Sequence, residues 1–193
     1  MRFIGIDASL TSTGICLIEE DNTFKTATVT SKPSDATPHA EDVRLATLTA
    51  EIAKNPKIVG VDAANDGLGG AAIAVLAKNG LAGKVPVTGQ DATDEGLTRV
   101  LEGTQCVTVY KAIKKEADAA SAAAIALANG QAPATNGTVK DSTSGMDVPS
   151  VLLTPQPIFK DNVKDVIADG FTTADKVCTT DELKAACAKY GVQ

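Results

Sequence analysis

Three short apolar runs, each followed closely by polar residues, constrain the fold of this chain more than any other feature. They span residues 58–61, 85–88 and 106–109 and are rich in β-branched side chains, as is typical of buried strands in a parallel sheet. Ligands of open α/β sheets bind outside the carboxyl ends of such strands. The sequence therefore predicts an α/β fold with a binding site at one edge of its sheet.

Asn65, Asp91 and Lys111 follow the three runs and are the candidate ligand-binding residues. A sugar hydroxyl both donates and accepts hydrogen bonds, so a sugar site needs mixed polar groups of this kind. The set suits binding rather than bond-making, and we predict that the chain is not an enzyme. Asn65 also suits the N-cap of a helix over residues 68–78, and Lys111 suits a solvated lysine at a strand end.

Residues 63–70, 80–92 and 103–111 resemble the second lobe of the type I periplasmic sugar-binding proteins of ABC transporters, in particular those for D-xylose. Residues 147–155 and 162–171 extend the resemblance, which covers roughly two thirds of the chain and is far more specific than a short motif.

In that family the matching Asn, Asp and Lys contact the pentose. The resemblance therefore implies that Asn65, Asp91 and Lys111 bind a sugar, and that Asp66 and Gln90 shape the loops around them.

The start of the chain suggests a different family. Residues 3–18 resemble the beginning of RuvC-like Holliday-junction resolvases, which are ribonuclease H-like enzymes. Apolar and β-branched patterns predict a three-strand antiparallel meander over residues 3–30, and a helix over residues 38–54 that leads into the strand at residue 58. The resemblance implies that Asp7 then lies beside Asp62, where paired carboxylates hold divalent metals for phosphodiester hydrolysis.

This nuclease reading is the alternative to sugar binding. A resolvase has Glu where this chain has Asp62, and the nearest further acidic residues are Glu116 and Asp118, with Ser121 at the place of a second Asp. A net charge of -6 and a pI near 4.8 disfavour nucleic acid as a partner, because phosphate contacts are made by clustered Lys and Arg. We therefore predict no catalytic residues, with Asp7, Asp62 and Asp118 as the alternative set.

The two resemblances meet near residue 58, which predicts a chimera, engineered or recombined. We expect one three-layer α/β domain over residues 1–193. In it, a resolvase-like meander (1–57) continues into the parallel, Rossmann-like half of a sugar-binding lobe (58–193). Sugar binding by such a half-site is expected to be weak or vestigial, and a ligand-free chimera is the third hypothesis.

Further predictions concern location and partners. The chain opens directly into a strand with no basic and apolar leader, which predicts a cytoplasmic protein as written, whereas the sugar-binding parent would be periplasmic or extracellular. No apolar run reaches the roughly 20 residues that span a bilayer. An Ala-rich helix over residues 114–129 would expose an apolar face, so a homodimer through it is one expectation. Residues 131–149 are predicted to form a long loop.

Cysteine spacing and glycine patterns address cofactors. The four cysteines include no Cys-x-x-Cys and there is one His, which disfavours a metal site. No Gly-x-Gly-x-x-Gly follows the first strand, so no dinucleotide cofactor is expected. Cys178 and Cys187 flank a short helix and form either a disulfide, as is plausible in a secreted parent, or a free pair. Cys16 and Cys106 lie in apolar runs and are expected to be core thiols.

Overall fold

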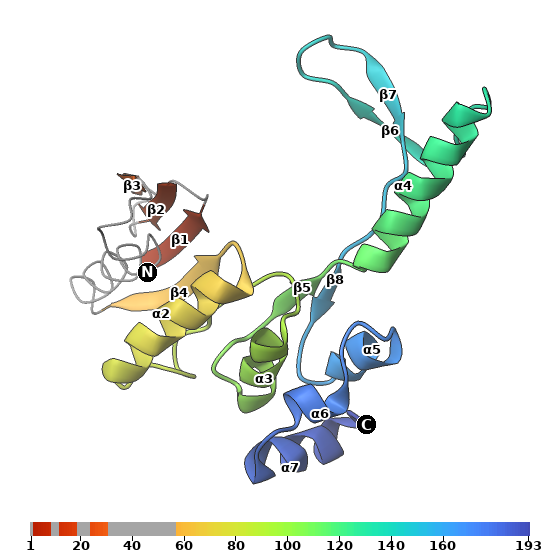
Figure 1. Ribbon diagram of the computed structural model, residues 1–193. Coiled ribbons are helices and arrows are strands. Elements are labelled where there is room, and N and C mark those ends of the chain that lie inside the picture. The colour runs from red at the N-terminus through yellow and green to blue at the C-terminus, as the bar shows by residue number, and fades with distance from the viewer. Residues whose placement is uncertain (1, 9–11, 19–23, 31–56) are drawn as a thin grey trace, which may run out of the picture. The chain divides into compact units, whose positions relative to one another are not determined.

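The computed structural model describes residues 2–8, 12–18, 24–30 and 57–193, which form two compact units (Figure 1). The first unit comprises Met1–Tyr110 and Pro157–Gln193, and the second comprises Lys111–Gln156. Both units contain helices and strands, so the chain is a mixed α/β protein. Whether the two units form the single domain over residues 1–193 that we predicted stays a prediction.

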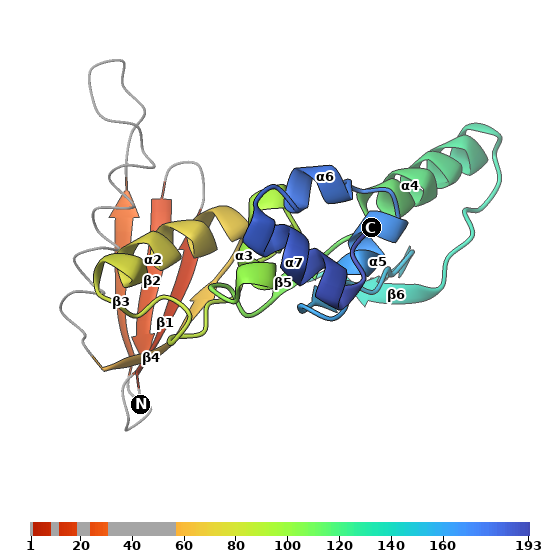
Figure 2. The ribbon, with the colours of Figure 1, turned by 90° about the horizontal axis from the view of Figure 1, so that it is seen from below.

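A four-stranded sheet lies at the start of the first unit. Its strands are β1 (Arg2–Ala8), β2 (Ser12–Ile18), β3 (Phe24–Thr30) and β4 (Ile58–Ala63), in the order β3-β2-β1-β4 (Figure 2). β2 is antiparallel to both β1 and β3, whereas β4 pairs with β1 in parallel. Three antiparallel strands and a parallel fourth are the arrangement that the sequence predicts. A ribonuclease H-like origin for them stays a prediction, and the helix expected over residues 38–54 lies outside the described residues.

The layer of strands continues beyond β4 in a less regular form. A parallel bridge joins Val61 to Val87, and another joins Gln90 to Val109, which belongs to β5 (Thr108–Tyr110). β5 in turn pairs with β8 (Gln156–Ile158). The strand predicted over residues 85–88 is reduced to one bridge, because Pro86 accepts from the Val61 N–H but has no N–H of its own to donate.

Five helices lie among the described residues of the first unit. They are α2 (Asp66–Lys78), α3 (Asp94–Glu102), α5 (Val163–Ala168), α6 (Ala174–Val177) and α7 (Asp181–Tyr190). The sequence predicts helices over residues 68–78, over residues 92–103 with Leu97, Val100 and Leu101 on one side, and over residues 180–188. α2, α3 and α7 are present at these places.

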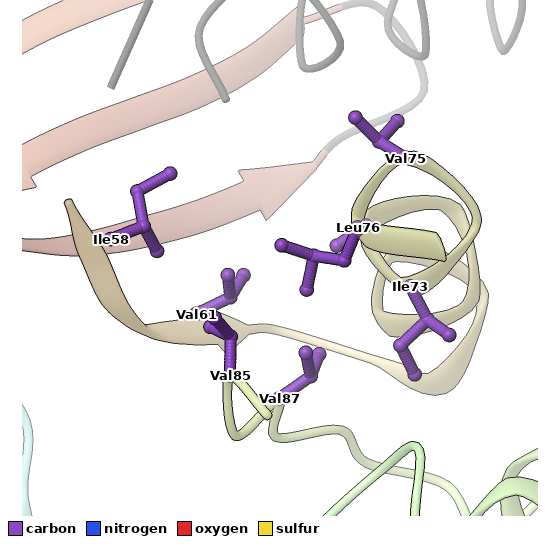
Figure 3. Close-up of a cluster of buried hydrophobic side chains, with 8 residues drawn as sticks. Ile58, Val61, Ile73, Val75, Leu76, Val85 and Val87 are labelled. Carbon is purple, nitrogen blue, oxygen red and sulfur yellow. The ribbon is translucent and has the colours of Figure 1, made fainter. Parts of the chain in front are cut away.

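A hydrophobic core lies between β4 and α2 (Figure 3). Leu76 of α2 and Val87 are fully buried, and Val61 of β4 is 2% exposed. Truncating a buried leucine of this kind costs about 2–5 kcal/mol of stability, so Leu76 contributes strongly to the packing of α2 against β4. Ile58, Ala72, Ile73, Val75 and Val85 complete this core.

A second group of buried residues joins α3 to the end of the chain. Leu97, Val100 and Leu101 of α3 are buried, as are Val177 of α6 and Leu183 of α7. The predicted apolar side of α3 is thus confirmed, and it packs against α6 and α7.

The cysteines fall into two kinds. Cys178 and Cys187 form a disulfide with their Cα atoms 6.2 Å apart, which joins the end of α6 to α7. Cys106 is a free and exposed thiol, so its expected place in the core is wrong. The reason is that β5 begins only at Thr108, which leaves Cys106 in the connection before the strand. The side chain of Cys16 lies outside the described part of the chain.

The second unit consists of α4 (Ile113–Ala128) and a hairpin of β6 (Gly137–Lys140) and β7 (Asp147–Ser150). The long loop predicted over residues 131–149 is therefore wrong. The turn of the hairpin is built by the Asp141 carboxylate, which accepts from the backbone N–H groups of Thr143 and Ser144.

No residue of α4 is buried, and Ile113, Ile125 and Leu127 are exposed. A homodimer through residues 114–129 stays a prediction. Within the described ranges, no helix is both long and apolar enough to cross a bilayer.

Candidate functional site

Asn65 stands at the junction of β4 and α2. Its extended backbone (φ -155°, ψ 172°) and its side chain, whose Oδ1 accepts from the Leu68 N–H at 2.9 Å, cap the helix. The predicted N-cap is thus confirmed. Capping uses the carbonyl oxygen alone, and no described group accepts a hydrogen bond from the Asn65 amide nitrogen. The two N–H donors of this side chain are therefore available to a ligand.

Asp91 lies in the loop that leads from the Val87 bridge to α3. Asp91 (φ 96°) and Ala92 (φ 49°) both have left-handed backbone conformations, which non-glycine residues rarely adopt. Each such residue costs on the order of 1–3 kcal/mol and persists only where its surroundings hold it. The Asp91 side chain is exposed, whereas Ala92 is fully buried. The backbone strain is thus concentrated at Asp91, the residue predicted to bind the sugar, and at its neighbour Ala92.

Backbone hydrogen bonds bring the loops of Asn65 and Asp91 together. The Asp66 N–H donates to the Gln90 carbonyl at 2.9 Å, and the Asp91 N–H donates to the Val109 carbonyl at 2.9 Å. The structure therefore places Asn65 and Asp91 at the same edge, as the sequence predicts. Lys111 directly follows β5 in the chain but begins the second unit, where it is half-buried.

A buried carboxylate organises this edge. Asp66 is fully buried, and its Oδ2 accepts from the Thr93 N–H (2.9 Å) and the Thr108 hydroxyl (3.0 Å). Its Oδ1 accepts from Gln105 Nε2 at 2.7 Å. Arg99 Nη2 donates to the backbone carbonyl of Asp66 at 2.6 Å. Asp66 thus connects the loops around the site, as the resemblance implies. The sequence alone does not predict its hydrogen-bond donors.

Arg99 links this carboxylate to α3. Its Nε donates to Gln105 Oε1 at 3.0 Å. Burial lowers the pKa of Arg99 from its ordinary value, while the nearby carboxylates of Asp66, Glu95 and Glu102 act in the opposite direction. An arginine remains protonated in proteins even so, and Arg99 therefore acts as a fixed cation and donor beside the network.

The alternative metal-binding residues are arranged differently. Asp62 is exposed and accepts from the Thr88 hydroxyl at 2.6 Å. In the parallel register Asp62 pairs with Gly5, two residues before Asp7. Asp118 lies on α4 in the second unit, where it pairs with Lys114. Among the residues that were placed, no three His, Cys, Asp or Glu side chains are grouped to hold a metal ion.

An amide and a carboxylate thus lie near the carboxyl ends of parallel strands, which is where α/β domains commonly bind their ligands. The chain belongs to the family of the periplasmic binding protein domain, whose model matches residues 5–132. The match begins within β1, so it includes the strands that we compared with resolvases. This family is a binding class, in agreement with the prediction that the chain is not an enzyme.

Individual relatives carry sugar-binding names. The D-xylose-binding periplasmic protein of Escherichia coli (strain K12) is 48% identical over 120 residues, which are 62% of this chain and 36% of that protein. Its namesake in Haemophilus influenzae is 38% identical over 118 residues, 61% of this chain and 35% of that protein. The chain thus spans about a third of the length of these relatives.

A solved structure shares the fold. The carbohydrate transporter solute-binding protein of Chloroflexus aurantiacus, in complex with D-glucose, has a TM-score of 0.59 and 30% sequence identity, and the similarity covers 71% of this chain and 40% of that one.

Proposed function

We propose that this chain binds a sugar of the pentose class, with D-xylose as the first candidate, through Asn65 and Asp91 of the first unit. A part for Lys111, which begins the second unit, stays a prediction. The observation that carries the proposal is the hydrogen bond from the Asp66 N–H to the Gln90 carbonyl, which sets the loops of Asn65 and Asp91 side by side. The xylose-binding names of the two sequence relatives support the choice of sugar.

Each group has a distinct task in this proposal. The Asn65 amide donates to one sugar oxygen, and the Asp91 carboxylate accepts from the hydroxyl groups. Asn65 and Asp91 approach a ligand from a single sheet edge, whereas tight sites bury 70–90% of a ligand's surface. The proposed affinity is therefore weak, on the order of millimolar.

The proposal also includes a location. The relatives are named as periplasmic proteins, and a disulfide is stable in such an oxidising compartment. We therefore propose that the chain functions outside the cytoplasm, in place of the cytoplasmic location expected from its first residues.

One observation favours a second candidate function, that of a metal-dependent nuclease. β1 and β4 are parallel neighbours, so the backbone positions of Asp7 and Asp62 lie on adjacent strands. A ribonuclease H-like segment, fused to a sugar-binding lobe, would use these two residues for Mg²⁺-dependent or Mn²⁺-dependent cutting of branched DNA. Loss of such cutting in Asp7→Asn would support this candidate, and its absence in the unmodified chain would exclude it.

Calorimetric titration with D-xylose tests the sugar proposal. We expect saturable binding at millimolar sugar that Asp91→Ala abolishes. Asp161→Ala removes another exposed carboxylate from the first unit and is expected to leave binding unchanged. A flat titration of the unmodified chain would overturn the proposal.

A further inference from the structure

The left-handed pair Asp91 and Ala92 is held by a short series of hydrogen bonds. The Ala92 N–H donates to the Thr108 hydroxyl at 3.0 Å, and the same hydroxyl lies 3.0 Å from Asp66 Oδ2. The next residue, Thr93, donates its N–H to the same carboxylate oxygen at 2.9 Å. The buried carboxylate therefore reaches both residues that follow Asp91.

The direction of these hydrogen bonds is fixed by chemistry. A backbone N–H only donates, so the Thr108 hydroxyl must accept from Ala92 and must give its one hydrogen to Asp66. The Asp66 carboxylate must then act only as an acceptor, because it also accepts hydrogen bonds from the Thr93 N–H and Gln105 Nε2, which can only donate. An amide at position 66 would bring an N–H group against one of these donors.

The space around the carboxylate is equally restricted. A Cβ atom on Gly89 would overlap with Asp66 Oδ1, and one on Gly96 would overlap with Asp66 Oδ2. Two glycines, Gly89 in a loop and Gly96 in α3, thus make room for one side chain. Because Asp66 is fully buried, it does not contact a ligand itself, and its influence passes through the loop that it holds.

We propose, on the basis of the proposed function, that Asp66 is a positioning residue: through Thr108 and Thr93 it holds Asp91 in the strained conformation that presents its carboxylate to the sugar. The affinity of the site then depends on a network that is out of reach of the ligand. Removing the network lets the loop relax to ordinary backbone angles, which turns the Asp91 carboxylate away from the sugar.

The test compares Thr108→Val with Thr108→Ser in the full chain, by titration with D-xylose. Valine has nearly the shape of threonine but no hydroxyl, whereas serine keeps it. We expect Thr108→Val to weaken binding about tenfold or more, in keeping with the loss of a buried acceptor, and Thr108→Ser to restore most of the affinity. Thr98→Val, which removes a hydroxyl bonded within α3, is the control and should bind as the unmodified chain does.

A rescue separates positioning from general destabilisation. Glycine adopts left-handed angles without strain, so adding Ala92→Gly to Thr108→Val should recover the affinity for the sugar. The same substitution removes a buried methyl group, so it should not recover thermal stability. Asp66→Asn should weaken binding as Thr108→Val does; if this variant fails to fold, the Thr108 pair alone decides.

The outcomes distinguish this inference from the proposed function. Equal affinities for Thr108→Val and Thr108→Ser, with binding intact in the unmodified chain, would overturn the positioning role. A flat titration of the unmodified chain would overturn the sugar proposal and the link to affinity with it. Amide hydrogen exchange decides the role of the network without any ligand: protection at Ala92 and Thr93 should be lost in Thr108→Val and kept in Thr108→Ser, and equal protection in both would refute it.

Discussion

The α-carbon of Gly96, in the first turn of α3, faces the buried carboxylate of Asp66 so closely that any side chain at position 96 would overlap with it. Asp66 begins α2 and Gly96 belongs to α3. The first turns of the two helices therefore meet at this carboxylate, which accepts from the N–H of Thr93, the N-cap of α3. The loop that carries Asp91 lies between the helices in the sequence.

A methyl group at position 96 should accordingly destabilise the protein. We expect Gly96→Ala to lower the free energy of unfolding by about 1–3 kcal/mol, because the overlap moves α3 away from the carboxylate. Gly67→Ala is the matched control: Gly67 is exposed in the first turn of α2, and its Cβ would meet only Asn65 Oδ1 at 3.4 Å. The control should be neutral or slightly stabilising. Urea unfolding measures the free energy of unfolding of both variants. Equal values would contradict the close approach of Gly96 to the Asp66 carboxylate.

The regular elements with strong local signals could be predicted. α3 has three apolar residues on one side and ends at Gly103, which adopts the left-handed C-cap conformation, and its limits differ little from the expected ones. The hairpin of β6 and β7 was missed because its strands carry only isolated apolar residues, Val139 and Val148, which the structure leaves exposed. Its turn is formed by hydrogen bonds to Asp141, among Asp, Ser, Thr and Gly residues that are also common in loops.

The site divides in the same way. Asn65 and Asp91 could be predicted because each follows an apolar run at a strand end. The partners of Asp66 could not, because Thr93, Gln105 and Thr108 lie 27, 39 and 42 residues away in the chain. A polar residue inside an apolar run, such as Thr108, was the one available signal, since a buried hydroxyl requires a partner.

Tyr110 should make stability depend on alkaline pH. Its hydroxyl donates to Asp169 Oδ2 at 2.7 Å, and its ring contacts the edge of Phe171. Burial, followed by the hydrogen bond to Asp169, raises the pKa of Tyr110 to about 12. The folded state thus holds this proton more tightly than the unfolded state, so its contribution is complete below about pH 10 and is lost as the pH rises toward 12.

Urea unfolding from about pH 8 to about pH 11 checks this dependence. The difference in stability between the unmodified chain and Tyr110→Phe should be constant at the lower end of the range and should shrink at the upper end. A difference that is independent of pH would show that the phenol proton of Tyr110, and with it the hydrogen bond to Asp169, does not contribute to stability.

The disulfide between Cys178 and Cys187 should stabilise the packing of α6 and α7 on α3. For a loop this short, with a sequence separation of 9, removing the crosslink in Cys178→Ser/Cys187→Ser should cost roughly 2–3 kcal/mol. Mass spectrometry should show a gain of two hydrogens on reduction of the unmodified chain. Cys106→Ser, which changes a free thiol, is the control and should neither remove that gain nor lower stability comparably.

Asn65 has two roles that a pair of substitutions can separate. Asn65→Asp keeps an oxygen for the Leu68 N–H and places a negative charge at the N-terminus of α2, so stability should change by only a few tenths of a kcal/mol. Asn65→Ala removes the cap and should cost about 1 kcal/mol. Both variants lose the amide donors, so both should weaken D-xylose binding to a similar degree. If Asn65→Asp binds the sugar normally in calorimetry, then Asn65 caps α2 and does nothing more.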